Sequence, residues 1–453
     1  MKNDDILRSW KEISAYLECD RRTCLRWEKS LGLPIHRMEG SEKGGVFAYR
    51  EELDKWLVGR SGQAEPAKPE TEIVEAGRKW VRLETRRWSR KRLIAFHLSL
   101  WALIIIAFVT LNGRSSPRVP IDFRIDGSEL AVLGEGGREL FRYKTGVKDL
   151  LDTEAYRQSL KGSAELGMSG KRLPYIGFHD IDLDGRRETL FTVQTADEVG
   201  EGEIVCLDTR GNKRWSFKAG RELSFGGQVF SSDYRICGFD LNDIDGDGKP
   251  EIQFYATHKP DWPCQFIVLS AEGRLLGEFW NSGYIGDFAF ADLNADGRTE
   301  MALCGVNNEY GQGIVAVFDA ADIQGASPQA DPKYRCDQLK PGSEKFYLRL
   351  PRTDADITLH PVEAINSVFV NQARELSFRA SLSGLFFEFD FGMDLHRVRN
   401  SHQFIQIHKA AVEAGRVTSV LNEDYLKSLG SKVLYWDGAA IEWTGRNAMA
   451  NKW

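Results

Sequence analysis

Three short segments of the chain repeat the same spacing of oxygen-bearing side chains. Each fits the pattern D-x-[DN]-x-D-G-x-x-E, and the segments begin at Asp180, Asp243 and Asp292. Positions 1, 3 and 5 converge when such a loop curls, the glycine permits the sharp turn, position 7 offers its carbonyl and the glutamate closes the shell. These are the demands of Ca²⁺, a hard cation that takes oxygen ligands. The predicted ligands are Asp180, Asp182, Asp184, Arg186 and Glu188; Asp243, Asp245, Asp247, Lys249 and Glu251; and Asp292, Asn294, Asp296, Arg298 and Glu300.

The alternative for these loops is a set of ordinary Asp/Gly turns that hold no metal. Three independent nine-residue matches favour calcium, most of all in the second loop, whereas Asn294 gives up one charge in the third. We expect the calcium to be structural, because neither an open coordination position nor an adjacent base can be inferred from the sequence.

The elements that must position these loops are β-strands. Each loop runs directly into an apolar segment, and a second apolar unit follows it after a short gap. The segments after the loops are 189–195, 252–257 and 301–306; the second units are 202–217, 264–279 and 313–320; weaker copies are 130–143, 384–398 and 432–443. Such repetition indicates a propeller or a related array. We therefore expect an all-β propeller of about five to seven blades, although residues 325–375 depart from the repeat.

The loops and strand pairs together resemble the FG-GAP or VCBS repeats of integrin-like β-propellers. The resemblance covers residues 160–321 well and the flanking residues loosely. That family's loops often close with Asp, whereas all three loops here close with Glu, which keeps the ligand type but changes its reach. The resemblance implies a calcium-binding β-propeller.

The first 60 residues predict a small α+β domain. A capping box begins a first helix at Ser9, and Asp20 caps a second helix that ends at Gly32. Two short strands follow, at 34–38 and 46–49, and then a short amphipathic helix. This is the order of a winged helix-turn-helix domain, in which the second helix enters the major groove of DNA.

The runs SWKEISAYLECDRRTCLRWEKSLGLPIHR and VFAYREELDKWL resemble the excisionase-like branch of the MerR-type DNA-binding domains. The resemblance rests on the Arg-Thr at the start of the second helix, the Arg-Trp one turn later, the Leu-Pro that enters the wing and the Phe-x-Tyr that closes it. It implies that the second helix contacts bases and phosphates and that the wing contacts the DNA backbone. The DNA-binding residues are then Arg21, Arg22, Thr23, Arg26, Lys29, Arg37, Lys43 and Arg50.

The charge of this domain leaves a second hypothesis open. Residues 1–60 hold 12 Lys+Arg and 11 Asp+Glu, so their non-specific affinity for DNA should be modest. The alternative partner is a cytoplasmic protein, as in cell-shape anchors that link such a domain to a filament. DNA is favoured, because binding a protein requires neither a wing nor a basic second helix. A homodimer is expected with DNA, since such domains usually read two half-sites.

An apolar segment separates this domain from the repeats. Residues 93–111 are 19 residues without Asp, Glu, Lys or Arg, close to the roughly 20 that cross a bilayer as a helix. Residues 78–92 hold eight Lys/Arg and one Glu, which places the N-terminal side in the cytoplasm. We therefore expect a single-pass protein of the bacterial inner membrane whose C-terminal domain is periplasmic or extracellular.

The predicted fold class is multi-domain, with a winged helix-turn-helix, one transmembrane helix and an all-β propeller. The domains are 1–60, the linker and basic juxtamembrane segment 61–92, the span 93–111 and the propeller 112–453. Charge follows this division, since residues 1–111 carry a net +5 and residues 112–453 a net −11. The function expected is a membrane-anchored transcriptional regulator whose propeller senses an unknown ligand or partner. The rival function is a structural tether or adhesin.

Catalysis finds little support in the sequence. G-x-S-x-G, H-E-x-x-H, P-loop and Rossmann patterns do not occur, and the histidines after the apolar segment belong to no recognisable ligand or nucleophile motif. We therefore expect that the protein is not an enzyme. The spacing of the seven cysteines leaves open whether Cys237 and Cys264 pair.

Overall fold

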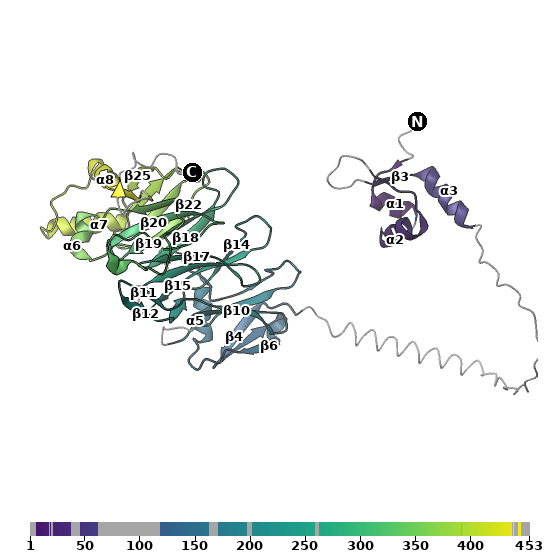
Figure 1. The fold of residues 1–453 in the computed structure, drawn as a ribbon, viewed down its shortest axis with the longest axis horizontal. Helices are drawn as coiled ribbons and strands as arrows, with labels where there is room; N and C mark the ends of the chain where they lie inside the picture. The colour runs from purple at the N-terminus through teal and green to yellow at the C-terminus, as the bar shows by residue number, and fades with distance from the viewer. Residues whose placement is uncertain are drawn as a thin grey trace, which may run out of the picture. The chain divides into compact units, whose positions relative to one another are not determined.

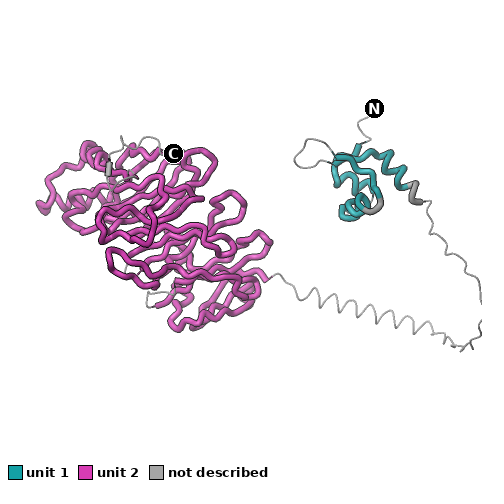
Figure 2. The backbone as a smooth tube through the Cα atoms, in the orientation of Figure 1, with its two compact units in different colours: residues 1–96 teal, residues 97–453 magenta. Residues whose placement is uncertain are grey.

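The structure is a computed structural model, and it forms two compact units, residues 1–96 and 97–453 (Figure 2). The described residues are 6–17, 19, 21–37, 46–61, 118–162, 171–196, 202–258, 262–390, 392–436, 438 and 443–444.

In its described residues, unit 1 combines three helices with a small antiparallel sheet in which β3 pairs with both β1 and β2. Its elements are β1 (Ile6–Leu7), α1 (Trp10–Tyr16), α2 (Arg21–Leu31), β2 (His36–Arg37), β3 (Val46–Tyr49) and α3 (Arg50–Ser61). The predicted capping box is present, since the Ser9 hydroxyl accepts from the backbone N–H of Glu12 at 3.2 Å and the Glu12 carboxylate accepts from that of Arg8 at 2.9 Å. The core of this unit consists of Leu7, Ile13, Cys24, Leu33, Val46, Ala48 and Leu53.

Unit 2 is mostly β and propeller-like, with successive antiparallel sheets. The first sheet contains β4 (Asp122–Asp126), β5 (Glu129–Leu133) and β6 (Glu139–Lys144), and the second contains β7 (Ile176–His179), β8 (Glu188–Thr192), β9 (Glu203–Leu207) and β10 (Lys213–Lys218). A two-stranded ribbon follows, made of β11 (Leu223–Phe225) and β12 (Gln228–Phe230). The third large sheet contains β13 (Tyr234–Ile236), β14 (Asp240–Asn242), β15 (Glu251–His258), β16 (Cys264–Leu269) and β17 (Leu275–Asn281).

Two more sheets and four α-helices make up the rest of the described part of unit 2. The fourth large sheet contains β18 (Ile285–Ala291), β19 (Glu300–Asn307), β20 (Gln312–Asp319), β21 (Phe346–Arg349), β26 (Leu434–Trp436) and β27 (Trp443–Thr444). The fifth contains β22 (Ile365–Val370), β23 (Leu376–Ala380), β24 (Phe386–Phe389) and β25 (Leu395–Arg399). The helices are α5 (Thr153–Ser159), α6 (Asp354–Leu359), α7 (His402–Glu413) and α8 (Glu423–Gly430).

The inner strands of the middle sheets are buried on both faces. In β16, Ile267 and Leu269 pack into the core shared with the second sheet, while Phe266 and Val268 pack into the core shared with the fourth. All eight residues of β19 are buried in the same way. Alternate side chains of one strand therefore enter two different cores, which explains why these strands are continuously apolar in sequence.

The fold class predicted from the sequence is wrong. Among the described residues no helix is long and apolar enough to cross a membrane: α3 and α7 have 12 residues each, whereas a span needs about 20. The predicted span 93–111 itself lies outside the described residues, as does nearly all of segment 61–92. The membrane location therefore stays a prediction from the sequence.

The other two parts of the predicted fold class also need correction. The sheets of unit 2 differ in size, and Figure 1 places β4 and β6 at the opposite end of the unit from β25, so the sheets do not close into a ring of five to seven blades. The physical reason is that, among the described residues, the first and fifth sheets each share a core with one neighbouring sheet and not with one another. For unit 1, the structure does not establish a helix-turn-helix fold.

Replacing a side chain between two sheets should destabilise unit 2 strongly. Phe254 of β15 is fully buried in the core between the second and third sheets. We expect Phe254→Ala to lower the free energy of unfolding by about 3–5 kcal/mol, because it removes a buried aromatic ring and leaves a cavity. Phe369→Ala is the matched control, since Phe369 is 53% exposed. Equal destabilisation of the two variants in urea unfolding would contradict the two-sided packing.

Candidate functional site

The three predicted metal loops occupy equivalent places in the fold. Each closes a hairpin from an outer to an inner strand: β7 to β8, β14 to β15 and β18 to β19. The glutamate at position 9 is in every case the first residue of the inner strand. Glu188, Glu251 and Glu300 are all buried there. The repeat seen in the sequence is therefore also a structural repeat.

The same hydrogen bonds hold all three loops. The glycine N–H at position 6 donates to the Asp at position 1, at 2.9, 2.9 and 3.3 Å in chain order. The Glu at position 9 accepts from the N–H of position 2, at 3.3, 3.0 and 2.9 Å. The position 2 side chains, Ile181, Ile244 and Leu293, are buried in the cores. Each loop is thus anchored by one buried apolar residue, and its first and last carboxylates accept backbone hydrogen bonds from within the loop.

The backbone of these loops is left-handed at position 4. Leu183 has φ 61° and Ala295 has φ 64°, where the second loop has Gly246. A side chain with a Cβ adopts this conformation at a cost of about 1–2 kcal/mol. The first and third loops therefore adopt the left-handed conformation at position 4 without the glycine that would adopt it free of strain.

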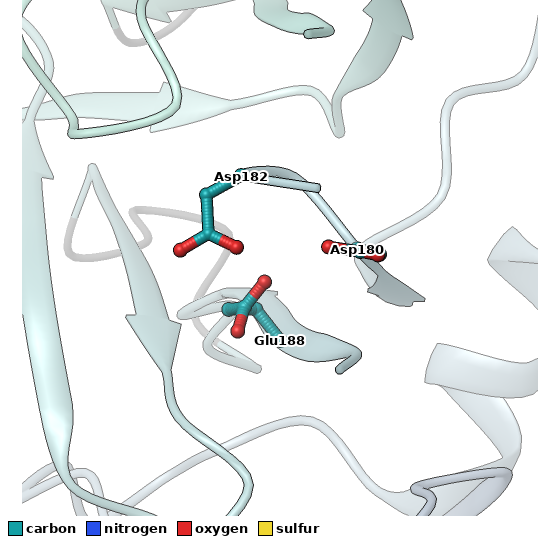
Figure 3. Close-up of side chains that lie close together, drawn as sticks. All are labelled: Asp180, Asp182 and Glu188. Carbon is teal, nitrogen blue, oxygen red and sulfur yellow. The ribbon is translucent and has the colours of Figure 1, made fainter. Parts of the chain in front are cut away.

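The carboxylates converge in the first two loops. Asp180, Asp182 and Glu188 each offer an oxygen atom, and these atoms lie within 4.8 Å of one another (Figure 3). Asp243, Asp245 and Glu251 do the same. Within the described residues the third loop forms no such acidic group, since its position 3 is an amide.

Basic side chains occupy the first and third loops. Arg214 of β10 donates to Asp182 at 2.7 Å and lies 3.2 Å from Glu188, so its guanidinium stands where a cation would neutralise these carboxylates. In the third loop Lys345 lies 3.5 Å from Glu300, and Arg374 lies 3.8 Å from Asp292. The chain supplies its own positive charge at both places.

The second loop differs. Within the described part of the chain, no basic side chain forms an ion pair with Asp243, Asp245, Asp247 or Glu251. Burial raises the pKa of Glu251, and the neighbouring aspartates raise it further. Two aspartates and a buried glutamate that converge without an ion pair are a donor set that fits Ca²⁺. The residues therefore fit calcium best in the second loop.

The remaining predicted ligands stabilise the backbone of the loops and are not among the converging carboxylates. The carboxylates of Asp184, Asp247 and Asp296 each accept from the backbone N–H of position 7, at 2.8, 2.7 and 2.8 Å. Position 7 is where Arg186, Lys249 and Arg298 were predicted to offer their carbonyls. Asn294 donates its amide to Asp296 at 3.1 Å.

The predicted DNA-binding residues fall mainly on one exposed surface of α2. Arg21, Arg22, Arg26 and Lys29 are exposed, while Cys24 on the opposite face is fully buried. Thr23 is half-buried at the start of the helix.

The predicted wing residues have other partners or lie outside the description. Arg37 donates to Glu28 at 2.8 Å, so its charge is already offset within unit 1. The Arg50 guanidinium lies over the ring of Tyr16, 5.1 Å from its centroid. Lys43 lies outside the described residues.

The basic side chains that approach the first and third loops were not predicted from the sequence. Arg214 and Lys345 lie 26 and 45 residues from the glutamates that they approach, and only strand pairing shows them as partners. The sequence of β10, KRWSFK, offered a signal, because it places two basic residues beside the loop.

The sequence also left open whether Cys237 and Cys264 form a disulfide. All seven cysteines are free, so these two do not pair.

No protein-family model matches the chain, and no curated protein matches it. Among solved structures it is similar to the Dos1 propeller, with 11% identity and a TM-score of 0.32 over 60% of this chain and 53% of that one. It is also similar to the C-terminal domain of Pseudomonas aeruginosa PilY1, with 13% identity and a TM-score of 0.31 over 60% and 53%. A third similar structure is the exotype rhamnogalacturonan lyase YesX, with 11% identity and a TM-score of 0.27 over 62% and 50%.

The chain spans about half the length of these three structures. At this level of similarity they transfer no activity or ligand to this chain.

The buried glutamate of the second loop should give stability a defined pH dependence. Because its pKa is raised in the folded state, Glu251 binds a proton more readily folded than unfolded, and stability without calcium should fall as pH rises from the usual carboxyl range toward neutrality. Glu251→Gln should reduce that fall, since the amide does not ionise. The measurement is urea unfolding at several pH values in a chelator. Glu423→Gln, at a site 91% exposed, is the control, and an unchanged fall in Glu251→Gln would contradict the assignment.

Proposed function

We propose that the protein is a DNA-binding transcriptional regulator. Unit 1 binds DNA through α2, and unit 2 holds structural calcium in its second loop and receives the ligand or partner that regulates DNA binding. The observation that carries this proposal is the exposed basic surface of α2.

The spacing on α2 suits a DNA groove. Arg22, Arg26 and Lys29 are separated by four and three residues, so they lie along one side of the helix, with Arg21 next to them. A helix of 11 residues is about 16 Å long, and the major groove, about 12 Å wide, admits a helix. Arginine can bind guanine through two hydrogen bonds or pair with phosphate. Two copies would read two half-sites.

The alternative of a cytoplasmic protein partner uses the same surface. If the partner is a protein, the chain should select no particular DNA sequence. One DNA-selection experiment therefore separates the two hypotheses. The near balance of charge in residues 1–60 means that specificity must come from this helix and not from bulk electrostatics.

The DNA proposal is tested with the full chain and a pool of random duplexes, followed by gel shifts on the selected sequence. Arg22→Ala and Arg26→Ala should each weaken binding by about tenfold or more, because a specific arginine contact contributes about 1–3 kcal/mol. Lys55→Ala is the control, since Lys55 is an exposed basic residue of α3 paired with Glu51. No selected sequence, or equal losses in all three variants, would contradict DNA recognition by α2.

The calcium proposal is tested by thermal unfolding and by calorimetric titration. Calcium should raise the melting temperature of the full chain, and Asp245→Asn should remove most of that rise, because it removes a charge from the loop without a counter-ion. Arg214→Ala should add a second binding event, since the first loop then loses its internal cation. A rise in melting temperature that survives in Asp245→Asn would place the calcium elsewhere.

A further inference from the structure

The last strand of the fifth sheet has an open edge. β25 pairs with β24 on one side, and no strand among the described residues pairs with its other side. In an antiparallel sheet, alternate residues of an edge strand turn their N–H and C=O groups outward. β25 therefore presents hydrogen-bonding groups that a further strand could use.

A groove of about 730 Å³ runs along this edge. Six consecutive residues, Leu395 to Asn400, line one wall. Because consecutive side chains of a strand point to opposite faces, a cavity that touches all of them follows the edge of the sheet and not one face. The facing wall is one side of α8, which contributes Glu423 and Lys427, and it continues at Ser431, the residue after the helix. Figure 1 shows α8 next to β25.

The groove carries positive charge above an apolar base. His396, Arg397 and Lys427 are exposed along it, and Arg399 is paired with Glu388 at 3.0 Å. Among the described residues that line it, Glu423 is the one acidic residue, 4.0 Å from Lys427 and 91% exposed. The apolar residues of the lining are Leu395, Val398, Leu421 and Leu426.

We propose that this groove binds an extended acidic peptide segment of a partner protein, which adds to the sheet as a strand beside β25. Addition of a strand at a sheet edge takes its affinity from main-chain hydrogen bonds and its selectivity from the alternating side chains. Side chains on one side of the peptide would meet the apolar base, and acidic side chains would meet Arg397 and Lys427. The docking surface is independent of DNA binding by unit 1, so either proposal can fail without the other.

The test uses the full chain and a fluorescent peptide of alternating Glu and Val, seven residues long, measured by anisotropy at low salt. A matched peptide of alternating Lys and Val tests the charge. Two further Glu-Val peptides carry N-methyl groups on one or the other set of alternate amides. We expect the Glu-Val peptide to bind, the Lys-Val peptide not to bind, and one N-methylated form to lose at least about tenfold in affinity, because that form cannot donate to the strand edge.

Variants locate the site. Arg397→Glu should weaken binding of the Glu-Val peptide by about tenfold at low salt, with less effect at high salt. Lys409→Glu on α7 is the matched control, since Lys409 is 68% exposed and outside the groove, and it should bind as the unmodified chain does. Thermal unfolding verifies that both variants fold, and the N-methylated peptides test the proposal on the unmodified chain in any case.

Three outcomes would overturn the proposal. They are no binding of the Glu-Val peptide, equal binding of both N-methylated forms and the parent, and displacement of the peptide by a single-stranded oligonucleotide at a lower concentration than by unlabelled peptide. The last result would make the groove a site for polyanions in general.

Discussion

The burial of inner strands on both faces is the constraint on which unit 2 depends. Because β8, β15 and β19 send alternate side chains into two different cores, each middle sheet is stabilised by two neighbours. The same packing holds the loops that precede these strands. Position 2 of each loop is buried in a core, and the glutamate of position 9 is the first residue of the strand. The packing thus fixes the carboxylates near one another before any cation is bound.

Carboxylates that lie close together repel one another, and the three loops differ in the positive charge that the chain places beside them. Arg214 supplies it in the first loop and Lys345 with Arg374 in the third, whereas the second loop has no ion pair of this kind among the described residues. Identical loop geometry therefore coexists with different electrostatics. A motif that appears three times in the sequence need not bind three metal ions.

The sequence predicted local features well and the assembly of sheets less well. The capping box at Ser9, the loop positions and the strands after them follow from spacing within a few residues, and those features recur in the structure. Closure into a ring depends on contacts between the first and last sheets, and no local pattern encodes them. The approach of Arg214 to Asp182 could not be predicted either, because it depends on how β10 pairs with β9. The strand edge of β25 likewise becomes visible only once its partners are known.

Strand periodicity distinguishes the middle sheets from the end sheet. In β23 the residues Leu376, Phe378 and Ala380 are buried while Ser377 and Arg379 are half-buried, whereas β19 is buried throughout. Among the described residues, each sheet shares its cores with its immediate neighbours. The fifth sheet should then be able to open while the second and third remain folded, so a signal received at that end could change local order without unfolding the domain.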